Sequence, residues 1–279
     1  MGTLIEFIDV CYTYPNGNEA LRDVNLKINL GESVAIMGEN GAGKTTMAKL
    51  MLGLIRPTSG RVLVDGIDTR KTTTAKIARK IGYIFQNPLY QLFSDTVEKE
   101  VSLGPKASGM GEKAVSERVD SVLREMGLEH LRGLPPLSLS EGERKRVAIA
   151  SVLSMDPLAL IIDEPTLGQD EIERLRLMQI LRGQLNKGKS VIIISHDVDF
   201  AYDVAERFII MKSGRIIGDL TKRDLLEKRE TLAEANLVMP QLLEIAEMMK
   251  RNGILRNNPV RELRELAEAI ISSVRDGLR

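Results

Sequence analysis

The stretch Gly38-Glu39-Asn40-Gly41-Ala42-Gly43-Lys44-Thr45 decides the fold of this chain. It matches the phosphate-loop pattern and has the context that the pattern requires, because the apolar run Ser33–Met37 precedes it and a helical pattern follows. The glycines allow backbone N–H groups to converge on phosphate groups, and the dipole of the following helix attracts the same anions. Lys44 is expected to neutralise the β- and γ-phosphates, and the hydroxyl of Thr45 to ligate Mg²⁺. The stretch therefore predicts bound ATP or GTP, and the alternative is an ordinary glycine-rich turn.

Two further apolar runs, Leu158–Ile162 and Ser190–Ile194, also read as buried strands. Helical patterns lie between the runs, so strand and helix alternate along the chain. This alternation predicts an α/β fold with a mostly parallel sheet. Ligands of such sheets bind beyond the carboxyl ends of the strands, so we expect functional residues directly after each run.

Two adjacent acids, Asp163 and Glu164, follow the second of these runs. Carboxylates that close a buried strand are costly unless a positive group meets them. We expect Asp163 to hold magnesium, usually through water, and Glu164 to orient and polarise an attacking water. The alternative is a strand end at which an acid only starts the next helix.

His196 and Gln86 also follow predicted strands. His196 could donate a hydrogen bond to the γ-phosphate and sense its loss, although a lone histidine is more often structural. Gln86 ends the run Ile81–Phe85, from where its amide can reach magnesium or the attacking water. For Gln86 the alternative is a surface glutamine.

The composition excludes several classes of protein. Lysine plus arginine equals aspartate plus glutamate at 39 each, so no net field attracts nucleic acid and we expect no nucleic-acid partner. The single cysteine, Cys11, excludes an internal disulfide and a cysteine-rich metal site, and the two histidines exclude a histidine metal cluster. We see no signal peptide, and the apolar runs are far shorter than the ~20 residues that cross a bilayer. We therefore expect a soluble chain, so that another subunit must span any membrane at which it works.

The residue pattern divides the chain into three parts. Residues 1–218 carry the expected ATPase domain, and residues 87–155 within it lack strand runs and read as an inserted helical subdomain. Residues 219–279 read as a small C-terminal helical domain, with apolar residues three and four apart. Asn258-Pro259 supplies an N-cap and first-turn pair for the last helix.

The segment Leu139-Ser140-Glu141-Gly142-Glu143, followed by Arg146-Val147-Ala148-Ile149-Ala150, resembles the signature helix of ABC ATPases, LSGGQ followed by RVAIA. The other motifs stand in the ABC order, and the resemblance covers roughly the first 220 residues. It implies a P-loop NTPase fold with a RecA-like core, the inserted helical subdomain and the small C-terminal helical domain. It also implies an enzyme that binds ATP and Mg²⁺ and hydrolyses ATP, with Glu164 and His196 as catalytic residues.

The resemblance enlarges the expected nucleotide site. Tyr14 stands where family members stack an aromatic ring on adenine, which favours ATP over GTP, and the chain has no NKxD guanine-reading motif. The metal is expected at Thr45, Gln86 and Asp163. The residues expected to bind the nucleotide are Tyr14, Gly38, Glu39, Asn40, Gly41, Ala42, Gly43, Lys44, Thr45, Thr46, Gln86, Ser140, Gly142 and Asp170.

The resemblance also implies a second subunit. Two ABC ATPase subunits face head to tail and enclose two ATP molecules, so that each site joins one phosphate loop to the other subunit's signature. Ser140 and Gly142 are then expected to act on the partner's γ-phosphate, and Asp170 at the subunit interface. ATP closes this pair and hydrolysis reopens it.

The chain is similar to the ATPases of energy-coupling-factor (ECF) importers in three stretches: Ile81–Pro88, Gln91–Pro105 and Glu164–Asp170. Those ATPases carry a C-terminal helical extension that helps them to dimerise. The similarity implies uptake of vitamins or nickel and cobalt ions through a membrane transmitter subunit and a substrate-binding membrane subunit. It places the chain peripherally at the cytoplasmic face of the cell membrane, with residues 87–91 docked on the transmitter.

Two departures from the family pattern bear on these expectations. Leu89 replaces the usual aspartate of the docking motif, which removes a charge pair with the membrane subunit. Glu141 and Glu143 replace a glycine and a glutamine of the signature, which favours a heterodimer over a homodimer. One hypothesis is that Glu141 slows hydrolysis at the partner's loop, because a carboxylate ~8 Å from a phosphate charge costs roughly 2 kcal/mol at an effective dielectric constant of ~20. The other is that Glu141 only favours the helix start, with its side chain in solvent.

Three other functions remain open. The chain could be the ATPase of an ABC transporter outside the ECF class, or a soluble ABC ATPase of DNA repair or translation. It could also be a nucleotide-gated interaction module that does not hydrolyse ATP. The stretch 87–105 and the C-terminal helices disfavour the first, and the lack of a long coiled-coil insert disfavours the second. Glu164 and His196 disfavour the third.

Overall fold

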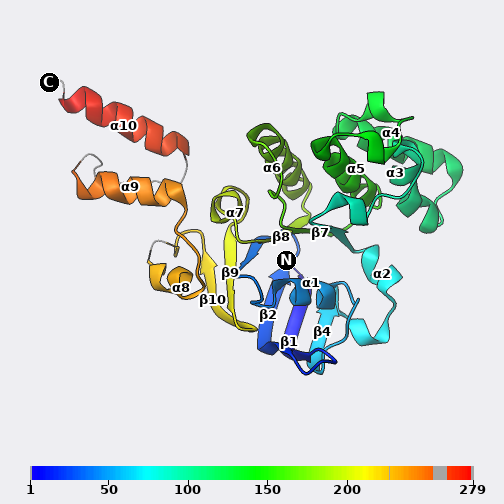
Figure 1. The fold of residues 1–279 in the computed structure, drawn as a ribbon, viewed down its shortest axis with the longest axis horizontal. Helices are drawn as coiled ribbons and strands as arrows, with labels where there is room; N and C mark the ends of the chain where they lie inside the picture. The colour runs from blue at the N-terminus through cyan, green and yellow to red at the C-terminus, as the bar shows by residue number, and fades with distance from the viewer. Residues whose placement is uncertain (1, 226, 254–262, 278–279) are drawn as a thin grey trace.

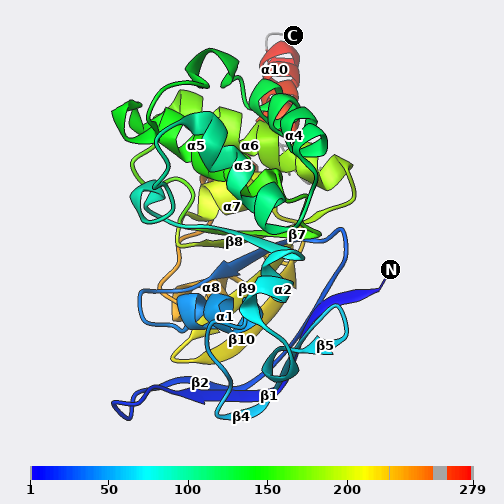
Figure 2. The same cartoon turned by 90° about the vertical axis from the view of Figure 1, so that its right-hand side faces the viewer.

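The computed structural model describes residues 2–225, 227–253 and 263–277. A central sheet has a layer of helices on one side and a second sheet on the other. In Figure 2 the helices of this layer are green, and strands β1, β2 and β4 of the second sheet are blue. The helices near the C-terminus extend away from this body (Figure 1). Among the described residues, no helix has the length and apolar character that crossing a membrane requires.

The central sheet has six strands in the order β10-β9-β3-β8-β7-β6. All neighbours from β9 to β6 are parallel, and β10 is antiparallel to β9. The predicted runs Ser33–Met37, Ile81–Phe85, Leu158–Ile162 and Ser190–Ile194 correspond to β3, β6, β7 and β8. Every residue of β3, β7 and β8 is buried, which explains why their sequences are continuously apolar. The strands are β3 (Ser33–Met37), β6 (Ile81–Ile84), β7 (Ala159–Asp163), β8 (Ser190–Ser195), β9 (Arg207–Lys212) and β10 (Arg215–Thr221).

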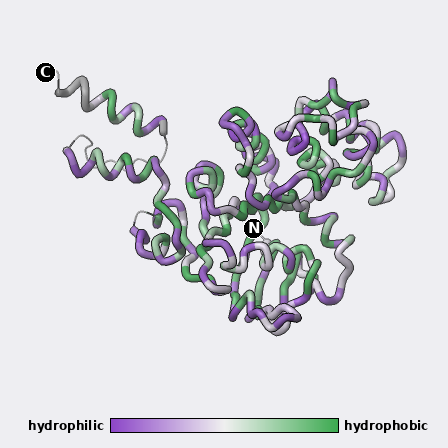
Figure 3. Tube along the Cα trace, in the orientation of Figure 1, coloured by the Kyte–Doolittle hydropathy of each residue, from purple (hydrophilic) through white to green (hydrophobic). Residues whose placement is uncertain are grey.

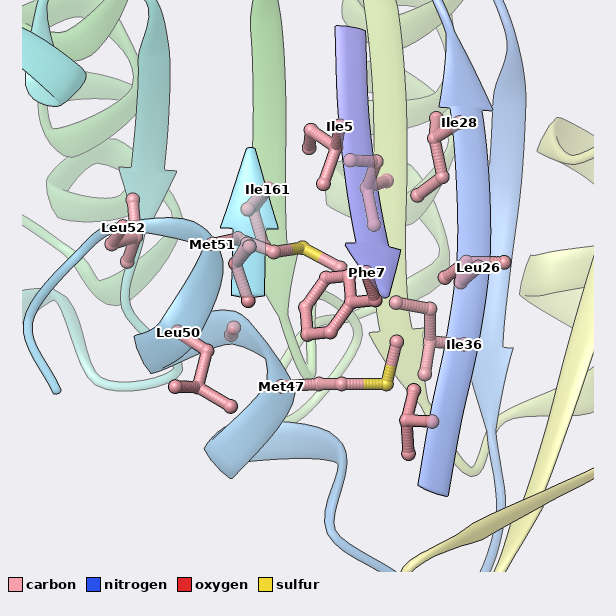
Figure 4. Packing of buried hydrophobic residues seen from close by; sticks show 14 of the residues in the cluster. Ile5, Phe7, Leu26, Ile28, Ile36, Met47, Leu50, Met51, Leu52 and Ile161 are labelled. Atoms are coloured by element: carbon pink, nitrogen blue, oxygen red, sulfur yellow. The ribbon is translucent and has the colours of Figure 1, made fainter. Parts of the chain in front are cut away.

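The second sheet is antiparallel, in the order β2-β1-β4-β5. Its strands are β1 (Thr3–Thr13), β2 (Glu19–Asn29), β4 (Ser59–Val64) and β5 (Ile67–Asp68). Helix α1 (Lys44–Met51) packs with residues of both sheets in one apolar cluster. Figure 4 shows Phe7 of β1, Ile36 of β3 and Met47 of α1 meeting in it. This packing fixes the start of α1, and with it the phosphate loop, against the central sheet.

The inserted segment between β6 and β7 is helical, as expected. Helices α3 (Val97–Ala107), α4 (Glu112–Glu125) and α5 (Glu141–Leu153) share a core with α6 (Glu171–Asn186). Val119 of α4, Val147 of α5 and Leu181 of α6 are buried in this core. The inserted segment also contains the short 3-10 turns η2 (Pro88–Tyr90), η3 (Glu129–Leu131) and η4 (Pro136–Ser138). Outside it lie the 3-10 turn η1 (Thr69–Lys71) and the helices α2 (Thr74–Ala78) and α7 (Val198–Val204).

The C-terminal region is helical, with α8 (Arg229–Glu234), α9 (Gln241–Arg251) and α10 (Leu263–Gly277). Strand β10 runs to Thr221, three residues past the expected end of the ATPase domain at residue 218. Leu225 and Leu232 pack in one cluster with Phe208 of β9, so the chain up to α8 belongs to the core. Helices α9 and α10 pair with each other and alternate between hydrophilic and hydrophobic residues (Figure 3). The expected capping pair Asn258-Pro259 lies outside the described residues.

Candidate active site

The phosphate loop lies between the carboxyl end of β3 and the start of α1. Gly38 and Gly43 have positive φ angles of 150° and 105°, and a Cβ at either position would lie within 2.7 Å of a backbone oxygen. Only glycine fits these two positions. Gly43 caps α1 without a side-chain hydrogen bond, so no side chain of the described residues caps the N–H groups of the first turn. These groups form an anion-binding helix start.

Lys44 lies under the loop and is 6% exposed. Its ammonium donates hydrogen bonds to the carbonyl oxygens of Gly38 (2.6 Å) and Glu39 (2.9 Å). Burial lowers the pKa of Lys44, and nearby carboxylates, chiefly that of Glu164, oppose this shift. In the part of the chain that the structure describes, the hydrogen bonds of the Lys44 ammonium go to carbonyl oxygens, so this buried cation can receive an anionic phosphate.

A cleft of 460 Å³ joins the loop to the ends of the neighbouring strands. It brings together ten of the residues predicted from sequence, from segments as far apart as β1 and β7. Those ten are Tyr14, Asn40, Gly41, Gly43, Lys44, Thr45, Thr46, Gln86, Asp163 and Glu164. The residues expected after separate strands thus lie together at one edge of the sheet.

Tyr14 stands at one end of this cleft. Its hydroxyl is 3.0 Å from the hydroxyl of Thr46 in α1, and its ring meets Tyr12 edge to face at 4.8 Å. These contacts fix the ring beside the phosphate loop, and Thr46 supports it. A fixed aromatic ring at the mouth of a phosphate site offers a surface on which a base can stack.

Asp163 ends β7 and is 8% exposed. Burial raises the pKa of its carboxyl group, while the hydroxyl of Tyr83, which donates a hydrogen bond of 2.7 Å to it, opposes the shift. Tyr83 was not among the site residues predicted from the sequence. Tyr83 lies on β6 opposite Ile161 of β7, and its only sequence signal is a hydroxyl within an apolar run.

The oxygen-bearing side chains near Asp163 fit a magnesium ion. Thr45 and Gln86 line the cleft with Asp163, and hydroxyl, amide and carboxylate oxygens are the ligands that Mg²⁺ accepts. Among the described residues, no three His, Cys, Asp or Glu side chains gather as a metal site, so a cation here depends on Thr45 and Gln86 as well. The carboxylate of Asp163 is buried, so a cation beside it would offset the cost of burying its charge.

Glu164 has a positive φ of 44°, which is uncommon for a residue other than glycine. Its N–H donates to the carbonyl of Ile194 on the neighbouring β8 at 2.7 Å. One carboxylate oxygen accepts a hydrogen bond of 3.0 Å from Ser195, and the other lies 3.0 Å from Nδ1 of His196. The pair Glu164 and His196 was predicted from the sequence, whereas Ser195, which is fully buried at the end of β8, was not.

The expected signature residues lie outside this cleft. Ser140 caps α5 in a reciprocal capping box, because its N–H donates to the Glu143 carboxylate at 2.9 Å and its hydroxyl accepts from the Glu143 N–H at 3.4 Å. The Ser140 hydroxyl also donates to the same carboxylate, at 2.7 Å. These bonds lower the pKa of Glu143. Gly142 leaves room for Glu173, whose N–H is capped by Asp170 at 2.8 Å. The starts of α5 and α6 therefore form one surface, and its residues Ser140 and Gly142 do not line the cleft of the phosphate loop.

Glu141 is exposed, but its side chain does not only face solvent. A Cβ on Gly168 would lie 2.5 Å from a carboxylate oxygen of Glu141. Glu141 also lines a second cleft, of 590 Å³, together with Thr45 and Asp163. The charge of Glu141 therefore faces a cleft that is also lined by Thr45 and Asp163, which are expected to hold magnesium.

The segment expected to dock on a membrane subunit forms the turn η2 and the residues after it. Asn87 accepts a hydrogen bond of 2.9 Å from the N–H of Leu89 and so starts the turn. Gln91 is turned inward and donates to Ala148 on α5. Leu89, Tyr90 and Phe93 are 49%, 78% and 77% exposed, which makes an outward-facing apolar group.

Comparisons with known proteins agree with this geometry. The sequence profile of the ABC transporter family matches residues 21–167. The energy-coupling factor transporter ATP-binding protein EcfA of Methanocaldococcus jannaschii is 34% identical over 275 residues, which cover 94% of this chain and 99% of that protein. The structure of cbiO1 from Clostridium perfringens, part of the ABC transporter complex cbiONQ, matches with a TM-score of 0.77 at 35% identity and covers 90% of this chain and all of that one. A dimeric ATP-binding cassette in a post-hydrolysis state, bound to ADP and Pi, matches with a TM-score of 0.70 at 31% identity, covering 78% and 98%.

Proposed function

The chain belongs to the ABC transporter family and is an ATP-binding subunit that hydrolyses ATP, and from this premise we propose that it energises an ECF-type importer of vitamins or transition-metal ions. One observation carries the proposal. The phosphate loop and the carboxylates after β7 share one cleft, while the Ser140 helix start lies outside it. Such a site needs a second subunit to complete it.

Hydrolysis is assigned to Glu164. Its carboxylate lies at the edge of the cleft, held by Ser195 and beside His196, so it can orient and polarise a water molecule next to the γ-phosphate. Thr45, Gln86 and Asp163 would hold Mg²⁺, which supplies positive charge to the phosphate oxygens when bound. Lys44 neutralises the same phosphates, and Tyr14 receives the adenine.

A second ABC ATPase subunit completes each site. Ser140 and Gly142 offer a hydroxyl and a backbone N–H at the start of α5 to the γ-phosphate of the partner's nucleotide, and Asp170 borders the same surface. The charges of Glu141 and Glu143 support a heterodimer with a related subunit, although a homodimer satisfies the same geometry. Helices α9 and α10 would add to the dimer contact.

The membrane partner is assigned to the apolar group of Leu89, Tyr90 and Phe93. These side chains project from the turn after β6, close to Gln86 of the active-site cleft, so a subunit bound there senses the state of the nucleotide. The transmitter subunit would bind this group, and a separate membrane subunit would bind the substrate. The chain itself would lie peripherally at the cytoplasmic face of the membrane.

Purification of the tagged full-length chain from detergent-solubilised native membranes tests this proposal. We expect a membrane transmitter, a substrate-binding membrane subunit and a second ATPase to co-purify. Tyr90→Asp combined with Phe93→Asp should abolish capture of the membrane subunits and leave the second ATPase bound. Capture of the membrane subunits of another transporter class, or of soluble partners only, would contradict the ECF assignment without affecting the ATPase assignment.

A further inference from the structure

Lys145 is a buried lysine in the second turn of α5, one turn after Glu141. It is 3% exposed, and its ammonium donates a hydrogen bond to the carbonyl oxygen of Pro165. Among the described residues it forms no ion pair. Burial lowers its pKa to about 8, and the charge of Glu141 only partly opposes that shift. A buried cation without a paired carboxylate reduces stability, so its position calls for a functional explanation.

Pro165 is the residue directly after the proposed catalytic base. Glu164 has a left-handed backbone conformation, which persists only where the surroundings hold it. On its N-terminal side, the Glu164 N–H is bonded to Ile194. On its C-terminal side, the ammonium of Lys145 donates a hydrogen bond to the carbonyl oxygen of Pro165. Among the described residues, no other group donates to that carbonyl. The backbone of Glu164 is thus clamped between β8 and α5.

We propose that Lys145 is a positioning residue that holds Glu164 in its working conformation and links it to the signature helix. The inference deepens the proposed function and rests on the roles given there to Glu164 and Ser140. Lys145 and Ser140 belong to one rigid helix, so a shift of α5 toward the partner's nucleotide moves the carbonyl bond at Pro165. Nucleotide binding at one site therefore changes the position of Glu164 at the other site through Lys145.

Two substitutions separate this role from a structural one. Lys145→Met keeps the length of the side chain but removes the donor and the buried charge, whereas Lys145→Gln removes the charge and keeps a donor. We expect Lys145→Met in the full-length chain, within its ATP-hydrolysing assembly, to lower kcat about tenfold or more, because a bond from a charged donor is lost. The ATP affinity should stay within about twofold of the wild type. The melting temperature should be unchanged or higher, because the buried charge is gone, and Lys145→Gln should recover part of kcat.

Lys189 provides a matched control, because it is also largely buried, at 14% exposure of its side chain, and pairs with Asp156 away from the cleft. Lys189→Met should keep wild-type kcat. The inference is overturned if Lys145→Met has wild-type kcat, or if its loss of kcat is matched by a loss of melting temperature and Lys145→Gln is no better. Glu164→Gln separates the two assignments. If that variant is inactive while Lys145→Met is fully active, only the role of Lys145 fails; if Glu164→Gln still hydrolyses ATP, the proposed base and the inference fail together.

Discussion

The side-chain amide of Asn236 donates a hydrogen bond of 2.7 Å to the carboxylate of Glu39 in the phosphate loop. Asn236 directly follows the last turn of α8 and has a positive φ of 55°. The neighbouring Ala235 and Leu237 are buried in the core, which holds the backbone at Asn236, and the exposed side chain reaches Glu39 from there. Since the carbonyl of Glu39 also accepts a bond from Lys44, the C-terminal region supports the loop that is proposed to bind the nucleotide.

Replacement of Asn236 by glycine should weaken nucleotide binding. Glycine keeps the left-handed backbone but removes the amide, which frees the Glu39 carboxylate and loosens the loop. Loss of one hydrogen bond of about 1 kcal/mol corresponds to about a fivefold rise in Kd for ATP. Titration with a fluorescent ATP analogue measures this change. Asn252→Ala, which removes an exposed amide at the end of α9, should have no effect, and an unchanged Kd for Asn236→Gly would show that the contact does not support the loop.

Asp163→Asn should stabilise the fold and abolish hydrolysis. Burial raises the pKa of Asp163, so the folded protein holds the proton more tightly than the unfolded chain. The free energy of unfolding of the wild type therefore falls as the pH rises from the ordinary aspartate value through the raised one. Asparagine lacks this cost and still accepts the bond from Tyr83.

Urea unfolding without nucleotide and magnesium measures this difference. Asp163→Asn should exceed the wild type at neutral pH, and the gap should close at acidic pH, where Asp163 is protonated. Asp95→Asn, at a largely exposed aspartate, should change little at either pH. A variant that is less stable than the wild type at neutral pH would contradict the account.

Much of this arrangement could be predicted from the sequence, for a physical reason. Strands β3, β7 and β8 are buried on both faces and therefore continuously apolar, and parallel strands bring their carboxyl ends to one edge. The antiparallel sheet of β1, β2, β4 and β5 was not predicted. Its strands alternate between buried and exposed residues. In β2 most of the exposed positions carry charged residues, so the buried apolar residues do not form a continuous run in the sequence.

The supporting contacts of the site could not be predicted. Tyr83 and Ser195 lie within strands, and only the register of β6, β7 and β8 places them beside Asp163 and Glu164. The bond between Asn236 and Glu39 joins residues 197 positions apart, which no local pattern reveals.

Glu141→Gly should increase ATP turnover. In the proposed dimer the Glu141 carboxylate, at the start of α5 beside Ser140, faces the partner's nucleotide and would repel its phosphate charge. Glu141 is exposed, so water and salt screen this repulsion. We therefore expect an increase of up to about tenfold in kcat/KM. The increase should shrink at high salt. Equal rates for the variant and the wild type in the assembled dimer would reject the repulsion and leave Glu141 as a helix-start residue.

The structure of the ATP-bound Glu164→Gln assembly tests the central claim most directly. The distance to measure is the one between the Ser140 hydroxyl and the γ-phosphate of the nucleotide in the partner's phosphate loop. In a homodimer that loop carries Lys44 and Thr45, and in a heterodimer it is the equivalent loop. The account predicts a hydrogen bond there, with the Ser140 hydroxyl released from Glu143. A Ser140 helix that lies far from every nucleotide in the assembly would contradict it.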